Sequence, residues 1–273
     1  MPQPSRPVWT VSHVGARENY AVARAYAAAG RLHRLYTDIW CRAGTGLLRR
    51  GPAVTRALAG RTHPAVPADR VVAFTPTALL GELRARLPPA RGPAQYDHYL
   101  RVGRWFDRRV ARHLAGHLLP DPPHAFYAFN TGCLETVRLL RDRGAVTVVY
   151  QIDPARVEYD LVRAEAAKWP GWVKAPPTIP DAYFERLAAE WAAADAVVVN
   201  SAWSAAALIR QGVPPEKLHV IPLAYDPSPD AEVRPPRTPG SPLVVLWLGN
   251  VVVRKGIQYL VEAACRLADR PIR

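Results

Sequence analysis

The sequence predicts an α/β protein built on a Rossmann-like, doubly wound parallel sheet. Short apolar, β-branched runs at 146–150 and 196–199 are typical of strands buried on both faces. Amphipathic segments with helical spacing lie between such runs, most clearly at 96–117 and 181–194. Strands that alternate with helices favour parallel βαβ units, so the fold class follows from this alternation.

The elements expected in the first part of the chain each follow from a local pattern of apolar spacing and of Gly or Pro at the ends. Residues 40–68 lack periodicity and are predicted to form surface loop with a short helix. The expected strands are 8–11, 32–37, 71–74, 125–129 and 146–150, and the expected helices are 18–29, 96–117, 133–142, 158–172 and 181–194.

Composition limits the class of protein. The 273 residues, 49% of them hydrophobic, can bury a substantial core. We expect neither a signal peptide nor a membrane span, because no apolar run is long enough. The widely spaced Cys41, Cys133 and Cys265 suggest reduced thiols of a cytoplasmic protein and no metal site.

The net charge of +13 favours an anionic partner. Five arginines lie on the polar face of the helix expected at 96–117: Arg101, Arg104, Arg108, Arg109 and Arg112. Two interpretations stay open, a solvated charged face and peripheral contact with an anionic membrane at the inner face of the cell membrane. We expect no nucleic acid partner, because no nucleic-acid-binding motif is present.

Residues 193–226 form the most informative segment, with the pattern of one strand–helix–strand unit. The strand at 196–199 is followed by Ser201, a good N-cap for a helix over 202–211. Gly212 ends that helix, and a second strand is expected at 218–222.

The sequence pattern of residues 193–226 resembles the end of the N-terminal domain in retaining GT-B glycosyltransferases of family 4. The matching residues are Ala194, Asp195, Val197–Val199, Ser201, Gly212, Lys217, Leu218, Val220–Pro222 and Asp226. The resemblance implies transfer of a sugar from a nucleotide-sugar donor to a hydroxyl acceptor, on a glycan or glycolipid, with retention of configuration. It implies no cofactor and no metal, since the nucleotide-sugar is a substrate.

The resemblance also places an acceptor site at the carboxyl ends of the strands, where doubly wound sheets bind ligands. It implicates His13 and Gly15 after the first strand. Asn130 and Thr131 follow the strand at 125–129, and either could cap the next helix while nearby N–H groups hold polar substrate atoms.

Family members often have a His–Asp pair after the strand corresponding to 146–150, where this chain has Gln151 and Asp153. We assign both to the catalytic region, as residues that orient sugar hydroxyls rather than as acid–base groups.

The chain is predicted to comprise an N-terminal acceptor-side domain over 1–225, a Pro-rich linker over 226–242, and the first βα unit of a second Rossmann-like domain over 243–273. That unit would contain a strand at 243–248 and a helix at 257–267 with Leu260, Val261, Ala264 and Leu267 facing inward. By resemblance, the turn between them holds the donor diphosphate with Gly249, Asn250, Arg254, Lys255 and Gly256.

The family's paired glutamates have no counterpart after Lys255, so we expect a fragment that is inactive or nearly so alone. The alternative is a non-catalytic half-protein with a regulatory role or with a basic surface that binds membranes. A nucleotide-dependent oxidoreductase is disfavoured, because the first βα turn lacks a glycine fingerprint.

Overall fold

The computed structural model describes residues 6–41, 44–79, 93–117, 124–173, 178–225 and 240–272. The chain divides into two compact units. Unit 1 comprises residues 1–155 and 179–223, and unit 2 comprises residues 156–178 and 224–273. Residues 156–178 thus group with the C-terminal residues, although the predicted N-terminal domain included them. The predicted domain boundaries remain predictions, and residues 226–239 of the expected linker lie outside the described residues.

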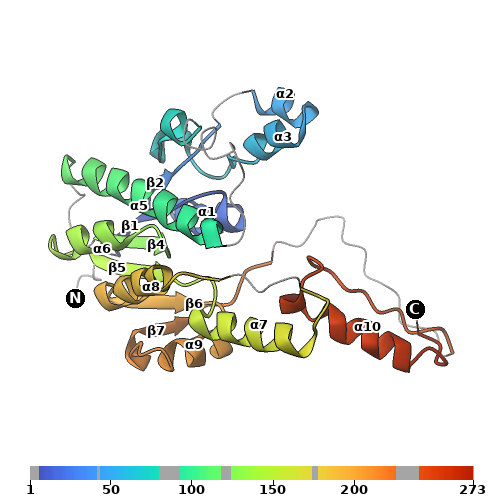
Figure 1. Ribbon diagram of the computed structural model, residues 1–273. Helices are drawn as coiled ribbons and strands as arrows, with labels where there is room; N and C mark the ends of the chain where they lie inside the picture. The colour runs from blue at the N-terminus through green and yellow to red at the C-terminus, as the bar shows by residue number, and fades with distance from the viewer. Residues whose placement is uncertain are drawn as a thin grey trace. The chain divides into compact units, whose positions relative to one another are not determined.

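Unit 1 is built on a seven-stranded parallel sheet, which confirms the predicted fold class (Figure 1). Its order, β3-β2-β1-β4-β5-β6-β7, reverses direction between β1 and β4, as in doubly wound folds. The strands are β1 (Val8–His13), β2 (Leu32–Thr37), β3 (Val71–Ala73), β4 (His124–Phe129), β5 (Val146–Tyr150), β6 (Ala196–Val199) and β7 (Leu218–Val220).

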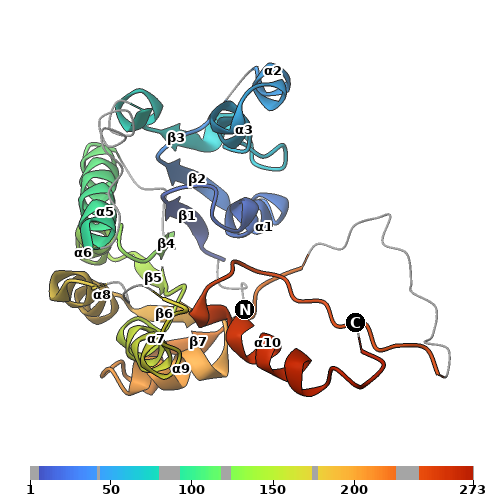
Figure 2. The same ribbon diagram turned by 45° about the vertical axis from the view of Figure 1, so that its right-hand side comes forward.

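Helices cover both faces of the sheet. Figure 2 shows α5 (Pro93–Ala115), α6 (Leu134–Arg141) and α8 (Asp181–Ala193) on one side and α1 (Ala21–Ala28) on the other. All six residues of β4 are accordingly buried. Tyr127 and Phe129 belong to a hydrophobic cluster with Val11, Tyr20, Leu35 and Tyr150. Burial on both sides explains why these strands are continuous apolar runs in the sequence.

The remaining helices of unit 1 are short. Those whose bounds lie within the described residues are α2 (Thr45–Arg50), α3 (Ala53–Ala59) and α9 (Ala202–Ile209), with the 3-10 turns η1 (Arg17–Tyr20), η2 (Ala68–Arg70) and η3 (Pro215–Lys217). The helix predicted to begin at residue 18 begins at Ala21 instead. Glu18, Asn19 and Tyr20 have φ angles of 48°, 51° and 61°, and this left-handed backbone cannot continue a right-handed helix.

The strand–helix–strand unit from β6 to β7 forms as expected. Ser201 is the N-cap of α9, and its Oγ accepts a hydrogen bond from the Ser204 N–H at 3.1 Å. Gly212 follows the helix with φ 88°. The Lys217 ammonium donates to carbonyl oxygens at the end of α8, among them that of Ala194 at 2.8 Å. These residues of the family resemblance therefore have structural roles, which stabilise the edge of the sheet.

Unit 2 contains α7 (Arg156–Lys168), η4 (Val253–Lys255) and α10 (Ile257–Arg266). Tyr259 of α10 packs edge-on against Trp169 at 5.3 Å and its hydroxyl donates to Glu165 of α7. Gln258 is the buried residue of α10.

Two predictions for unit 2 are wrong. No strand forms over 243–248, where Leu246 and Leu248 are 82% and 91% exposed. Only an isolated bridge joins Leu243 to Ile272 in this segment. A strand needs a neighbour to satisfy its backbone groups, and the described residues of unit 2 supply none. The helix expected at 257–267 forms, but its predicted inward residues Val261 and Leu267 are more than 40% exposed, being 43% and 42%.

Candidate functional site

The carboxyl ends of β1, β4 and β5 bring together the residues predicted for the acceptor site. The ring of His13 lies 5.2 Å from that of Phe129, the last residue of β4. The Asn130 N–H donates to the Tyr150 carbonyl oxygen at 3.0 Å, which ties the loop after β4 to the end of β5. These three loops therefore form one edge, at the place where a doubly wound sheet binds its ligand.

His13 is a buried, neutral histidine. Its Nδ1 lies 2.7 Å from the Gly15 carbonyl oxygen, and since a carbonyl can only accept, Nδ1 carries the proton. Burial lowers the pKa of His13 to about 4, so Nε2 holds a lone pair at neutral pH. The imidazole is packed against Tyr20 as well as Phe129 and is 2% exposed. Its clearest role is to shape the loop after β1, while its predicted contact with acceptor stays a prediction.

Gly15 is held by a carboxylate from the neighbouring strand. Its N–H donates to Asp38 Oδ1 at 2.8 Å, and Arg61 approaches the same oxygen at 3.4 Å. Gly15 has φ 82°, and an added Cβ would lie 3.2 Å from Arg61 Nη1. The left-handed backbone of this turn therefore favours glycine, and a larger residue would also press on the Arg61 side chain. Sequence reasoning missed Asp38 and Arg61, because they belong to segments that carry no motif.

Both polar atoms of the Gln151 side chain form hydrogen bonds within the protein. Its Nε2 donates to the Asp153 carbonyl oxygen at 2.9 Å, and its Oε1 accepts from Trp191 Nε1 at 2.9 Å. The residue is fully buried. The expected hydrogen bond to a sugar hydroxyl therefore has no free donor, and in this structure Gln151 is a positioning residue for the loop after β5.

Asp153 keeps capacity for a ligand. Its Oδ1 accepts from the Ala155 N–H at 2.9 Å and lies 3.3 Å from Gln151 Nε2. Its Oδ2 has no hydrogen-bond partner within the described part of the chain, and the residue is half-buried. A carboxylate oxygen fixed in this way at a strand end can accept a hydrogen bond from a hydroxyl.

The loop after β4 is held in place by two side chains of α8. Thr131 has φ 76°, its N–H donates to Glu190 Oε2 at 2.7 Å, and its carbonyl oxygen accepts from Arg186 Nε at 2.8 Å. Its backbone is thus committed to α8. Asn130 differs, because its side-chain Oδ1 is buried without a partner among the described residues. Of these two predicted residues, Asn130 has the unused acceptor.

The expectation that Asn130 or Thr131 caps α6 is wrong. The N-cap position is Cys133, with no capping hydrogen bond from its side chain. Asp107 of α5 instead accepts from the N–H groups of Glu135 and Thr136 at 2.8 and 3.0 Å. Asp107 of α5 and Glu190 of α8 thus accept hydrogen bonds from backbone N–H groups that the sequence suggested were open to substrate.

Three carboxylates, those of Asp107, Glu135 and Glu190, surround one buried guanidinium. Arg186 Nη2 lies 2.8 Å from Asp107 Oδ2 and 2.7 Å from Glu135 Oε2, and Glu190 lies 3.4 Å from Nε. Burial raises the pKa of Glu190 to about 7 and raises that of Asp107. Burial also opposes ionisation of Glu135, but hydrogen bonds with Asp107 and Arg186 hold its pKa at about 2. These shifts arise from a structural ion network that joins α5, α6 and α8.

Three polar residues at this edge were not predicted. Glu18 and Asn200 both approach the Tyr150 hydroxyl, and burial raises the pKa of Tyr150. Glu18 is exposed and lies in the left-handed run of η1. Non-glycine residues in this conformation are uncommon and cluster at functional sites. The sequence of residues 17–20 contains no pattern that predicts this left-handed backbone conformation.

In unit 2, the predicted diphosphate loop ends at the N-terminus of α10. Gly256 is its N-cap with φ 73°, and its carbonyl oxygen accepts from Tyr259 and Leu260. A Cβ on Gly249 would lie 3.8 Å from the Lys255 side chain, which is exposed. Gly249, Lys255 and Gly256 are therefore close together, beside the N–H groups of the first helical turn.

The other two residues of that loop have internal partners. Arg254 Nη1 donates to Glu158 Oε1 of α7 at 2.9 Å, although the side chain remains 48% exposed. The Asn250 carbonyl oxygen accepts from the Val252 N–H at 2.8 Å. Part of the Arg254 guanidinium is thus engaged by Glu158, whereas Lys255 is an exposed cation with no ion pair among the described residues.

Within the described ranges, no group of three or more His, Cys, Asp and Glu side chains is placed to hold a metal ion. None of the described helices combines the length and apolarity that crossing a bilayer requires.

Several solved structures are similar to this chain, and two of them are described here. One is UGT89C1 of Arabidopsis thaliana complexed with UDP, with 12% identity and a TM-score of 0.41 over 88% of this chain and 57% of that chain. The other is a UDP-glucosyltransferase from Polygonum tinctorium capable of glucosylating indoxyl, in complex with 3,4-dichloroaniline, with 15% identity and a TM-score of 0.32 over 82% of this chain and 54% of that chain.

The chain thus spans about half the length of these structures. Similarity at this level identifies neither a reaction nor a substrate. No model of a known family and no curated protein matches the sequence.

Proposed function

We propose that this chain belongs to a nucleotide-sugar-dependent glycosyltransferase of the GT-B type and of family 4. It would contribute the acceptor-side domain and the beginning of the donor side. The observation that carries the proposal is the unit from β6 to β7. Its family-like residues lie in sequence order on a strand, a capped helix and an edge strand of a doubly wound sheet.

In the proposed reaction, the bond between the anomeric carbon and the diphosphate oxygen breaks. A bond forms to the acceptor oxygen, with net retention of configuration, and the acceptor's hydroxyl proton leaves with the departing diphosphate or to water. The acceptor would lie at the carboxyl ends of β1, β4 and β5, where His13, Asn130 and Asp153 offer acceptor atoms. Gln151 would keep Asp153 in place.

The leaving diphosphate would be stabilised without a metal by the Lys255 ammonium and by the N–H groups at the start of α10. Charge that develops on a leaving group is lowered in energy by such fixed donors, because they need no reorganisation during the reaction. The proposed location is the cytoplasm, where the three free cysteines would stay reduced.

Binding of nucleoside diphosphates, measured by calorimetry with UDP, GDP and ADP, tests the donor side. We expect weak but measurable binding of one of them, and Lys255→Ala should reduce it about tenfold, the loss of one charge-assisted contact. Arg270→Ala is the control, because Arg270 is a 68% exposed cation of the same unit outside the loop. Equal binding by both variants, or no binding of any of the three diphosphates, would contradict the proposed donor site.

The reaction itself is tested by NMR of the product formed with the matching nucleotide-sugar. A product of inverted configuration would rule out the retaining mechanism. Transfer depends on the donor site, so the binding measurement comes before the NMR experiment.

A further inference from the structure

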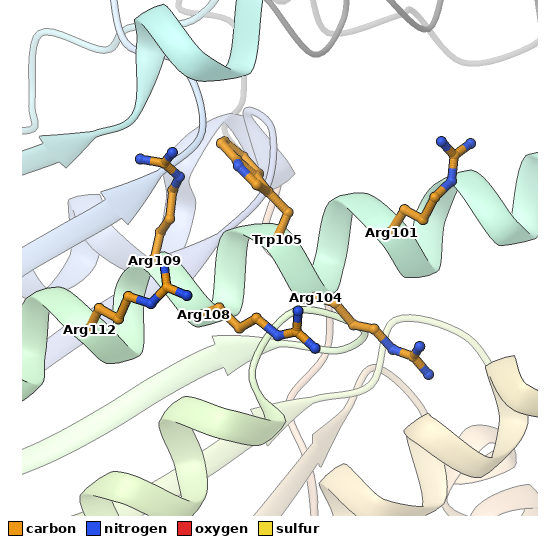
Figure 3. A pocket seen from close by; sticks show the side chains of 6 residues that line it. All are labelled: Arg101, Arg104, Trp105, Arg108, Arg109 and Arg112. Carbon is orange, nitrogen blue, oxygen red and sulfur yellow. The ribbon is translucent and has the colours of Figure 1, made fainter.

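The exposed side of α5 carries a groove that the proposed reaction does not use. It measures about 400 Å³ and is lined by Arg101, Arg104, Trp105, Arg108, Arg109 and Arg112, called here the arginine groove (Figure 3). The i, i+4 spacing makes two ridges, Arg101–Trp105–Arg109 and Arg104–Arg108–Arg112. With a rise of ~1.5 Å per residue, these arginines extend along roughly 16 Å of helix.

No acid of the described residues neutralises this groove. Asp107 is the only acid between residues 98 and 117, and it is fully buried, facing Arg186 and the start of α6. Among the described residues, none of the carboxylates forms an ion pair with Arg101, Arg104, Arg108 or Arg112. Exposed like charges at this spacing repel one another within a Debye length of about 8 Å, so a layer of anions is a favourable partner.

Trp105 is already engaged, which argues against a stacked base as the ligand. The Arg109 guanidinium lies 5.3 Å from the Trp105 ring and 5.9 Å from that of Phe74. Phe74 meets Trp105 edge-on at 6.4 Å. Single-stranded nucleic acids depend on open aromatic faces for stacking, and this tryptophan supports an arginine instead.

The groove also lacks the features of a site for one small anion. It lies in the middle of a helix, where backbone N–H groups are bonded along the helix and none converges on a ligand. Its donors are side-chain guanidinium groups in two open rows. Such rows fit many phosphates spread over a plane, each held by charge and by forked hydrogen bonds.

The apolar face of α5 is not available for insertion into a bilayer. Phe106, Val110 and Leu114 are buried in unit 1. Binding to a membrane would therefore be electrostatic, through the arginines alone. This differs from an in-plane amphipathic helix, whose apolar face enters the lipid.

We propose that the arginine groove of α5 is a docking surface for the phosphate head groups of an anionic phospholipid bilayer. Binding at this surface would require neither the sugar donor nor the sugar acceptor, so this proposal can be tested independently of the transferase reaction.

Co-sedimentation of the full chain with vesicles tests it. We expect binding to vesicles of phosphatidylcholine mixed with phosphatidylglycerol, little binding to phosphatidylcholine alone, and release by high salt. Arg104→Glu/Arg108→Glu should weaken binding at least about tenfold, because each arginine near an anionic surface contributes appreciably to affinity. Arg104→Lys/Arg108→Lys, which keeps the charge, should bind nearly as the parent chain does.

Arg49→Glu/Arg50→Glu is the matched control, since both arginines are exposed on α2 and the change in net charge is identical. Equal loss in the two reversal variants would mean that binding follows net charge, which would overturn the proposal. Circular dichroism of each variant shows whether it is folded. Tighter binding of a single-stranded oligonucleotide than of anionic vesicles at the same salt, abolished by the same α5 variant, would assign the groove to nucleic acid instead.

Discussion

A Cβ added to Gly103 would lie 2.4 Å from the carbonyl oxygen of Thr131. Helix α5 thus crosses the loop after β4 at backbone distance. The same oxygen accepts a hydrogen bond from Arg186, so it has little freedom to move away. This contact fixes how closely the arginine-bearing helix approaches the candidate acceptor edge.

Gly103→Ala should therefore destabilise unit 1 by about 2 kcal/mol, although Gly to Ala inside a helix ordinarily stabilises by up to ~1 kcal/mol. Denaturant unfolding measures the change. Gly116→Ala is the control, because its nearest atoms would be 3.9 Å from the new Cβ. A stable Gly103→Ala variant would show that the loop yields easily.

Arg186→Met should lower the free energy of unfolding by about 3–5 kcal/mol, because it leaves Asp107 and Glu190 buried without their cation. Chemical denaturation at neutral pH is the measurement. Arg141→Met removes a pair with Asp195 whose side chains are 47% and 39% exposed, and it should cost less than about 1 kcal/mol. Similar losses in the two variants would contradict the network role of Arg186.

His124→Leu should stabilise the protein in mild acid. Both ring nitrogens of His124 are buried without partners among the described residues, and burial followed by the nearby His33 lowers its pKa to about 4. The unfolded chain, with an ordinary histidine pKa of about 6.5, binds more protons than the folded chain between pH 4 and 6.5.

The stability contributed by neutral His124 is thus complete above pH ~6.5 and lost as the pH falls through that range. His124→Leu should flatten this loss and add about 1 kcal/mol by removing an unsatisfied polar group. Thermal unfolding from pH 4 to 8 checks both effects. A residual slope is expected from His13, whose pKa is lowered in the same way. An unchanged slope would contradict the assignment to His124.

Glu18→Gly should stabilise unit 1 by about 1 kcal/mol, because glycine adopts φ 48° without the steric cost that glutamate bears. Asn19→Gly should gain less, since asparagine tolerates this region. Thermal unfolding of the two variants is the measurement. A loss of stability in Glu18→Gly would show that the carboxylate beside Tyr150 contributes more than the backbone costs.

The fold was predictable because the strands are buried on both faces. Such strands leave runs like Val197–Val199, and the caps at Ser201 and Gly212 are local signals that need no tertiary information. The failure at 243–248 has the opposite origin. An apolar run specifies a strand only if neighbouring strands exist to pair with it, and that condition is not local.

The candidate site was predictable only in position. Strand ends can be located from the sequence, so the loops with His13, Asn130 and Asp153 can be placed at one edge of the sheet, while their role as an acceptor site stays a prediction. Their chemistry was not, because partners such as Asp38 and Glu190 come from distant segments. Burial decides whether a polar side chain is occupied, and Gln151 illustrates this, since Trp191 and Asp153 use its amide.

The contacts made by Asp107 and Glu190 near the start of α6 also set an order in which this region can fold during synthesis. Asp107 leaves the ribosome before Glu135, but Glu190 follows its partner Thr131 by 59 residues and Arg186 follows Asp107 by 79. At roughly 5–20 residues per second, the loop after β4 waits several seconds for its final bonds. During that time Asp107 is held by the start of α6 without its guanidinium, so the nascent chain is expected to stay open to proteases and chaperones at this loop until α8 has emerged.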